Sequence, residues 1–392
     1  MLKPKPIRNE FLPPFRPNLG KEEINEVVDT LKSGWITTGP KVNRFEEAIK
    51  KYIGCQEAIA VSSCTEGLEL CLLAAGIGRG DEVITSPLTF VSTANIILHQ
   101  GAKPVFVDID KETLNIEHSK IEKAITKRTK AIISVHYGGQ PCDLERILKI
   151  AKRYNLRVIE DAAHAIGAEY KGKKIGTISD FTVFSFYAAK NLTTAEGGMI
   201  CLQDKKLAER LKILSLHGIS KDAWKRYSAE GSWYYEVLEP GYKSNMTDIQ
   251  ASLGIHQLRK LEKFIKRKEE IARLYNRTLG QMPEIIIPKV KNNIRPAWYL
   301  YPILLNTDLL KIDRSNFIEA LKAENIGTSV HFIPVHLHPY YKKTFGFKMG
   351  DFPNSEYVYE RIISLPIHSS MTLKDAKDVI TAIKKIINYY KK

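Results

Sequence analysis

The stretch Arg157-Val158-Ile159-Glu160-Asp161-Ala162-Ala163-His164-Ala165 decides the fold. Its apolar, β-branched first half is typical of a strand buried on both faces, and the strand runs into two acidic residues and a histidine. A second apolar run, residues 182–186, leads into Phe184-Ser185-Phe186-Tyr187-Ala188-Ala189-Lys190-Asn191. An acid and a lysine therefore each follow a predicted strand closely.

Five more apolar runs surround these two, at residues 58–61, 82–85, 104–108, 131–135 and 199–202. Helical segments are expected between most of them, at 67–75, 92–100, 119–124 and 144–154. This alternation predicts an α/β domain built on a mainly parallel, seven-stranded sheet. Ligands of such sheets bind beyond the carboxyl ends of the strands, so Asp161 and Lys190 are expected to face one crevice.

The pattern changes after residue 248. A long helical period covers 249–279, strand-like runs follow at 297–305 and 328–332, and further helical runs cover 314–324 and 374–390. We therefore expect an N-terminal arm (1–20), a large α/β domain (21–255) and a smaller C-terminal α+β domain (256–392).

Composition excludes several classes of protein. Of the 392 residues, 44% are hydrophobic and 26% charged, as in a globular protein with a large core. No apolar run approaches the ~20 residues of a membrane span, and the N-terminus lacks the apolar segment of a secretory signal, so we expect a cytoplasmic protein without membrane contact. Five widely spaced cysteines without a CxxC pair predict free thiols.

The formal charge of +15 allows two interpretations. A basic face could bind nucleic acid, or a lysine-rich surface could simply be solvated. The basic residues are spread along the chain, and the densest stretch, residues 259–268, has the character of a solvated helix face that also carries Glu. The second interpretation is favoured, and no nucleic-acid partner is expected.

A lysine and a buried carboxylate are the two groups that pyridoxal phosphate (PLP) requires. The amine of Lys190 can link covalently to the aldehyde, and the carboxylate of Asp161 can keep the pyridine nitrogen protonated. Most lysines are exposed, but Phe184, Phe186 and Tyr187 indicate partial burial, which lowers a lysine pKa and makes the amine a usable base. The alternative for Asp161 is a structural salt bridge.

Other motifs are weaker by themselves. The run Ser62-Ser63-Cys64-Thr65-Glu66-Gly67 begins a helix after a strand and could hold a phosphate on its free N–H groups, or merely cap the helix. Phe90 at a strand end could stack on a flat ring, although a core position is commoner for a lone aromatic. Three histidines between 331 and 338 lack an acidic or Cys ligand at a typical spacing, so no metal site is expected.

With these residues in view, the sequence resembles the DegT/DnrJ/StrS family of sugar aminotransferases, PLP enzymes of fold type I. The resemblance covers nearly the whole chain. Its most specific stretches are residues 33–40, 160–165, 185–191 and Gly241-Tyr242-Lys243-Ser244-Asn245-Met246-Thr247-Asp248. Residues 135–138, 217–218 and 236–243 are most similar to UDP-4-amino-4-deoxy-L-arabinose–oxoglutarate aminotransferases of that family.

The resemblance implies a role for each matching residue. Lys190 would carry the covalent link and Asp161 would face the pyridine nitrogen. The remaining cofactor contacts would come from Cys64, Thr65, Glu66, Phe90, His164, Ser185, Lys243 and Asn245. The nucleotide-sugar pocket would be lined by Trp35, Ile36, Thr37, Thr38 and His331.

Three positions differ from the common family pattern. Glu66 stands where a small residue is usual, so its side chain must turn away from the phosphate. Phe90 stands where the closest relatives carry Trp, which keeps stacking and loses an indole N–H. Lys243 takes a place where many members have Asn, and it could still reach a phosphate as a point charge.

The resemblance further implies an aminotransferase that moves the amino group of an amino acid, L-glutamate by preference, onto a nucleotide-diphosphate 4-keto sugar. Pyridoxamine phosphate and 2-oxoglutarate would form on the way. The family pattern is a homodimer with shared active sites. The alternatives are a sugar dehydratase of the same fold, which Lys190 argues against because His is usual there, and a non-catalytic regulatory protein. The identity of the sugar, the aminated carbon and the pathway stay open.

Overall fold

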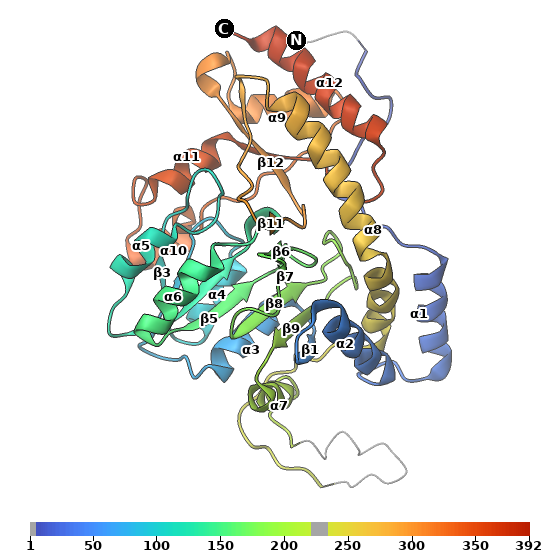
Figure 1. Ribbon diagram of the computed structural model, residues 1–392, viewed down its shortest axis with the longest axis vertical. Coiled ribbons are helices and arrows are strands. Elements are labelled where there is room, and N and C mark those ends of the chain that lie inside the picture. The colour runs from blue at the N-terminus through green and yellow to red at the C-terminus, as the bar shows by residue number, and fades with distance from the viewer. Residues whose placement is uncertain (1–4, 221–233) are drawn as a thin grey trace.

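A computed structural model describes residues 5–220 and 234–392 of the chain. These residues build a seven-stranded sheet with the strand order β1-β9-β8-β5-β4-β2-β3 (Figure 1). Its strands are β1 (Glu57–Val61), β2 (Glu82–Thr85), β3 (Lys103–Phe106), β4 (Thr129–Val135), β5 (Arg157–Asp161), β8 (Phe181–Ser185) and β9 (Gly198–Leu202). Four neighbouring pairs are parallel, and only the two pairs that involve β9 are antiparallel. The expected mainly parallel α/β sheet is confirmed, and each of the seven apolar runs forms one of its strands.

Helices cover both faces of this sheet, which explains why its strands are apolar throughout. Side chains alternate along β5, so Val158 joins one core and Ile159 the opposite one. On β8, Phe184 packs in the same core as Val158, and Val183 packs in the same core as Ile159. The helices of this layer are α2 (Pro40–Ile53), α3 (Cys64–Ala74), α4 (Ser92–His99), α5 (His118–Ala124), α6 (Leu144–Tyr154) and α7 (Lys205–Leu214).

The sheet register places the predicted acid at a strand end. Asp161 is the last residue of β5, rather than the first residue after it, and it pairs with Val135 of β4 and Val183 of β8. Because parallel strands end at one edge, the end of β8 at Ser185 lies beside it. This edge is where the site residues gather.

A second, three-stranded sheet lies above the first in Figure 1 and has the order β10-β12-β13. It consists of β10 (Ile285–Ile286), β12 (Tyr301–Leu305) and β13 (Ile362–Leu365), and its helices are α9 (Arg314–Ala323), α11 (Pro353–Arg361) and α12 (Leu373–Tyr390). Helix α8 (Asp248–Leu279) joins the two parts, since Leu261 packs in the first core and Tyr275 in the second. The expected domain boundary at 255–256 falls within this helix and stays a prediction.

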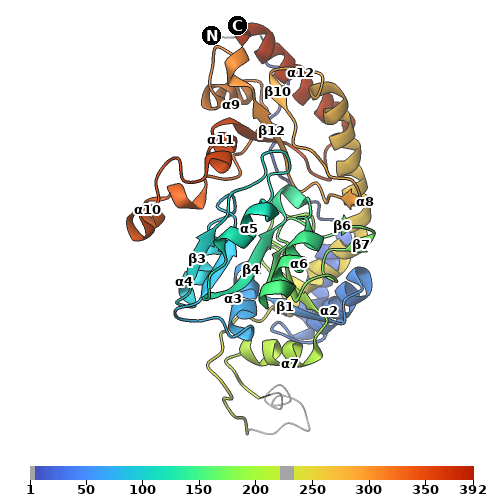
Figure 2. The same cartoon turned by 60° about the vertical axis from the view of Figure 1, so that its left-hand side comes forward.

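Smaller elements complete the described chain. Helix α1 (Lys21–Ser33) packs along α8, and Leu12 of the N-terminal arm enters the second core (Figure 1). A third sheet joins β11 (Ile294–Arg295), β6 (Glu169–Tyr170) and β7 (Lys173–Lys174), while helix α10 (Pro339–Phe345) extends to one side in Figure 2. Short 3₁₀ turns span Tyr137–Gly139, Thr307–Leu309 and Val335–Leu337. The first four residues of the predicted arm lie outside the described residues.

Two further observations concern the composition. The five cysteines are buried free thiols. Within residues 5–220 and 234–392, no helix combines the length and apolarity needed to cross a bilayer.

The prediction of a strand over residues 328–332 is wrong. Only Ser329 pairs there, in an isolated bridge with Ser364. A regular strand would turn consecutive side chains to opposite faces. His331 and Phe332 instead contact each other and the same cluster of rings. Similarly, of the expected strand over 297–305 only Tyr301–Leu305 is formed.

Candidate active site

Lys190 lies in the turn that follows β8. Its backbone N–H donates to the Tyr187 carbonyl at 2.9 Å, and its Nζ is 4.2 Å from the centroid of the Tyr299 ring. Burial lowers the pKa of Lys190 to about 8, and the nearby Cys64 and Asp161 oppose this shift. Such a pKa leaves roughly a tenth of the amine unprotonated at pH 7, against well under a thousandth for an exposed lysine.

Asp161 is buried, with 6% of its surface exposed. Thr93 Oγ1 donates to its Oδ2 at 2.7 Å, Thr89 Oγ1 lies 2.8 Å from Thr93 Oγ1, and the Ala163 N–H donates to Oδ1 at 3.2 Å. These donors fix the orientation of the carboxylate. The two threonines were not singled out from the sequence, although both stand in the strand-to-helix segment around Phe90.

The neighbouring acid has a different environment. Glu160 points to the opposite face of β5, where Thr182 Oγ1 donates to it at 2.9 Å and His136 Nε2 lies 2.7 Å away. Because His136 Nδ1 accepts the Cys142 N–H, Nε2 carries the proton that is donated to Glu160. Glu160 is thus fully paired within the core, and Asp161 is the carboxylate that faces the crevice.

His164 stacks on the ring of Tyr299, at 4.3 Å between centroids and an interplanar angle of 30°. Burial, together with the charge of Lys190, holds the pKa of His164 well below its usual range, so the ring is neutral. The Gly138 N–H donates to its Nδ1 at 3.3 Å, which places the ring proton on Nε2. His164 therefore offers a neutral, planar donor beside Lys190.

The start of α3 forms a cradle of backbone N–H groups. Ser63 caps the helix by accepting the Glu66 N–H at 3.1 Å, whereas the N–H groups of Cys64 and Thr65 have no partner within the described chain. Gly198 lies so close that a Cβ there would be 2.7 Å from the Cys64 nitrogen. The geometry suits a phosphate bound at a helix N-terminus, with the buried Ser185 beyond it.

Of the two side chains at this helix start, Glu66 is oriented as predicted from the sequence, whereas the side chain of Cys64 does not face the site. The Glu66 carboxylate accepts the Ser244 hydroxyl and so turns away from the helix N-terminus, as the sequence requires. The Cys64 thiol points into the core toward the Val183 carbonyl at 3.6 Å, and burial raises its pKa well above the usual value. Cys64 can therefore contribute its backbone and not its sulfur.

Phe90 is 57% exposed and lies 6.0 Å from Phe332 between ring centroids. Such exposure argues against the alternative that Phe90 is a core residue. His331 donates or accepts through Nδ1 at 2.9 Å from Ser364 Oγ, and its ring meets Phe15 edge-on at 5.7 Å. Burial and the charge of Lys190 lower the pKa of His331 to about 4.

The predicted substrate residues 35–38 lie together with Lys243 and Asn245, which were expected to contact the cofactor. Lys243 Nζ donates to Asn245 Oδ1, and Asn245 Nδ2 donates to Thr38 Oγ1, both at 2.6 Å. Trp35 Nε1 donates to the Thr38 carbonyl at 2.9 Å, and the Thr37 carbonyl accepts the Asp248 N–H at 3.0 Å. Trp35 and Ile36 are exposed, at 43% and 49%. The structure thus joins 35–38 to 243–245, whereas no hydrogen bond or ion pair links this group to Lys190 within the described chain.

Lys268 is a site residue that the sequence reasoning missed. It belongs to the run 259–268, which was expected to be a solvated helix face, yet it is only 4% exposed. Its Nζ donates to Asn191 Oδ1 at 2.6 Å and lies 5.9 Å from the Tyr299 ring centroid. The available signal was its spacing, because Leu261, Ile265, Lys268 and Ala272 fall on one helical stripe that is otherwise apolar.

Comparison with known proteins identifies a family. The model of the DegT/DnrJ/EryC1/StrS aminotransferase family matches residues 17–384. The chain is 55% identical over 381 residues to the spore coat polysaccharide biosynthesis protein SpsC of Bacillus subtilis, covering 97% of this chain and 98% of SpsC.

Solved structures agree. The putative sugar aminotransferase Spr1654 of Streptococcus pneumoniae in its PMP form has a TM-score of 0.90 and 35% identity, covering 96% of this chain and 99% of that one. A PLP form of Spr1654 is also known. Helicobacter pylori PseC, an aminotransferase involved in pseudoaminic acid biosynthesis, has a TM-score of 0.90 and 31% identity over 97% of this chain and 100% of its own.

Proposed function

The chain belongs to the DegT/DnrJ/EryC1/StrS aminotransferase family, and from this premise we propose that it transfers the amino group of L-glutamate to a nucleotide-linked 4-keto sugar. The family predicted from the sequence is thereby confirmed. The cofactor is pyridoxal phosphate, which the pneumococcal relative carries in its aldehyde and amine forms. Spr1654 is described as a putative sugar aminotransferase, and PseC as an aminotransferase of pseudoaminic acid biosynthesis.

One observation carries the proposal. A buried amine with a pKa near 8 lies within electrostatic range of a buried carboxylate, at the carboxyl end of a parallel sheet. The residues present fit the cofactor, because the partnerless N–H groups of Cys64 and Thr65 match a phosphate and Asp161 matches a cationic ring nitrogen. When bound, PLP supplies an aldehyde that accepts the amino group and a ring that withdraws electrons.

Each neighbouring residue then has a defined task. Asp161, oriented by Thr93, would hold the proton of the ring nitrogen. His164 and Phe90 would contact the ring, and Ser185 would add a hydroxyl to the phosphate cradle. Glu66 contributes its backbone N–H while its carboxylate remains on Ser244.

Lys190 moves the proton of the reaction. Its Nζ would take the α-proton of the amino donor and hold it for return, and it would move a proton in the opposite direction when the keto sugar is aminated. A pKa near 8 suits this exchange at neutral pH, because both the protonated and the free amine are available.

The sugar nucleotide is assigned to Trp35 to Thr38 and to His331, which lies on the Lys190 side. Lys243 and Asn245 would hold the cofactor phosphate. Since 35–38 and 243–245 make no hydrogen bond or ion pair with Lys190 in the described chain, we propose a homodimer in which each subunit completes the site of the other. The charge of +15 favours a diphosphate ligand.

The test begins with the purified protein and PLP. A visible absorption band that L-glutamate abolishes, together with covalent trapping by borohydride on the peptide containing Lys190, is expected. In Lys190→Ala, the cofactor should no longer be linked covalently to the protein, and borohydride should trap no cofactor-bearing peptide. Retention of turnover by this variant would falsify the assignment. Assays of UDP- and dTDP-linked 4-keto sugars with glutamate then identify the acceptor.

A further inference from the structure

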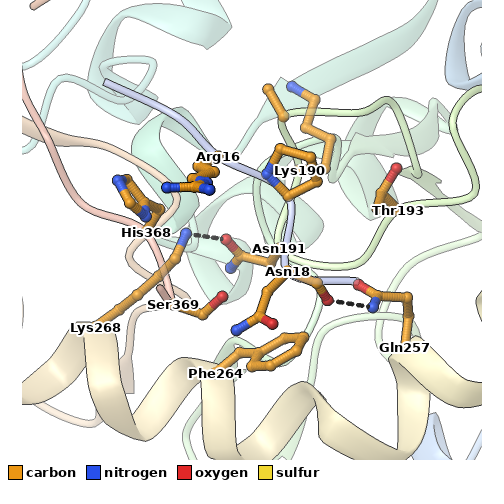
Figure 3. A pocket seen from close by; sticks show the side chains of 12 residues that line it. Arg16, Asn18, Lys190, Asn191, Thr193, Gln257, Phe264, Lys268, His368 and Ser369 are labelled. Carbon is orange, nitrogen blue, oxygen red and sulfur yellow. Dashed lines mark hydrogen bonds between the residues drawn. The ribbon is translucent and has the colours of Figure 1, made fainter. Parts of the chain in front are cut away.

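Beside Lys190 lies a small hollow with an enclosed space of about 10 Å³, which the function above leaves without a role (Figure 3). No acidic side chain lines it within the described chain. The charged or titratable groups of its lining are Arg16, Lys190, Lys268 and His368. A hollow with this lining is suited to an anion.

The cationic groups are not neutralised by the protein. Lys268 has the Asn191 amide oxygen as its hydrogen-bond acceptor and the Tyr299 ring nearby, with no carboxylate on it in the described chain. Burial and the charge of Lys190 lower the pKa of Lys268 to about 7. A buried ammonium without a counter-ion is costly, and an arriving anion would relieve that cost.

His368 is buried, with 6% of its surface exposed, and neither ring nitrogen completes a hydrogen bond. The Pro13 carbonyl faces the ring without meeting hydrogen-bond geometry. Burial, then the charge of Lys268, lowers the pKa of His368 to about 4, so the neutral ring offers one N–H donor. Unpaired buried polar atoms of this kind call for a partner.

Arg16 completes the group from the N-terminal arm. Its exposed guanidinium has no ion pair with any described residue, and Figure 3 shows it beside His368 and the end of Lys268. The arm is held over the site because Phe15 stacks on Tyr299 at 5.7 Å and meets His331 edge-on. A guanidinium binds a planar carboxylate through two parallel hydrogen bonds.

Size and position select among anions. Lys190 is part of the lining of the hollow, and both Lys190 and Lys268 face Tyr299, at 4.2 Å and 5.9 Å from its centroid, so the hollow adjoins the reacting residue. The enclosed space, about 10 Å³, is of the order of one water molecule and is too small for a nucleotide. One carboxylate oxygen can enter this space while the attached carbon chain stays outside it.

We propose that Arg16, Lys268 and His368 form the subsite that binds a carboxylate of the amino donor. The inference rests on the proposed function and adds residues to it. The carboxylate is either the α-carboxylate or the distal carboxylate of a dicarboxylic amino acid, and both offer the same planar, singly charged group.

The experiment measures binding separately from chemistry. Calorimetry with glutarate, an unreactive dicarboxylate, is performed on the PLP-loaded protein and on Arg16→Gln and His368→Phe. We expect affinity to fall by about 10- to 100-fold in Arg16→Gln and several-fold in His368→Phe, as for lost hydrogen bonds to a charged group. Lys21→Gln, which removes an exposed charge at the start of α1 outside the hollow, is the control and should bind as wild type.

A second measurement distinguishes the two carboxylates. Spectral titration of the same proteins with L-glutamate and L-alanine reports donor binding. If Arg16→Gln weakens both donors, the subsite holds the α-carboxylate, and if it weakens only glutamate, the subsite holds the distal one. Either pattern supports the proposal.

Two results would overturn it. One is unchanged affinity for glutarate and glutamate in both variants, and the other is equal weakening in Lys21→Gln. Failure of the wild type to respond to any amino acid would instead reject the proposed function, whereas glutarate binding would still report on the hollow.

Discussion

Lys190 and Lys268 both lie near the ring of Tyr299, and their surroundings differ in the charge of the neighbouring groups. Burial lowers the pKa of both, to about 8 and about 7. Lys190 has the carboxylate of Asp161 within range, whereas Lys268 has an amide on one side and the charge of Lys190 on the other. Burial alone therefore does not define a nucleophile. The two lysines differ in the neighbouring charge: Lys190 has a carboxylate within range and is assigned the reaction, whereas Lys268 has no counter-ion and is assigned the binding of an anion.

The largest effect is expected from Asp161→Asn, because the amide cannot hold a cationic ring nitrogen by charge. We expect kcat/KM to fall by about 10³-fold, the scale of a lost electrostatic partner of a reacting group. Steady-state kinetics on the variant check this. The control is Asp180→Asn, at the opposite end of β8, and wild-type kinetics in Asp161→Asn would disprove the assignment.

The next prediction concerns Lys190 in the cofactor-free protein. Its reaction with an acylating reagent should follow a titration midpoint near pH 8, because burial disfavours the ammonium. This is about 10²-fold more free amine at pH 7 than at an exposed lysine. Since Asp161 opposes the shift, Asp161→Asn should move the midpoint below 8. Peptide mapping of the labelled lysine measures it, and a midpoint above 10 would refute the burial argument.

Thr93→Val tests how Asp161 is oriented. The variant keeps the side-chain shape but removes the donor to Asp161 Oδ2, and it leaves the Thr89 hydroxyl without its neighbour. A lost hydrogen bond to a charged group corresponds to about 10- to 100-fold weaker PLP binding. Reconstitution titrations measure this, with Thr93→Ser expected to restore affinity. Equal affinity in Val and Ser variants would show that the hydroxyl has no such role.

The smallest effect sharpens the contrast between the lysines. Donor affinity should decline as the pH rises above about 7, because Lys268 then loses the charge that attracts a carboxylate. The groups around it are Lys190, Arg16, His368 and Tyr299, of which His368 is already neutral there. In Lys268→Met the decline should vanish, at the cost of about tenfold affinity at pH 6. Lys266→Met, exposed on the same helix, should keep the wild-type profile.

Much of the fold followed from the sequence because it depends on local patterns. The seven apolar runs predicted the seven strands, and helix α6 spans the predicted residues 144–154. The strand predicted over 328–332 is absent because the apolar residues there pack in a cluster of aromatic rings and do not pair with a neighbouring strand. Local pattern cannot distinguish these two uses.

The same limit applies to the site. Asp161 and Lys190 were identified because each follows a strand, and strand ends meet at one edge of a parallel sheet. The sequence by itself also determined the α/β architecture and a helix N-terminus within residues 62–67, whereas the structure decided that Ser63 is its cap. Only the tertiary structure decided which acid faces the crevice, that Thr93 supports it, and that Arg16, Lys268 and His368 meet behind Lys190. Those three residues lie on an arm, a helix and a loop separated by 100 positions or more, and only packing brings such distant segments together.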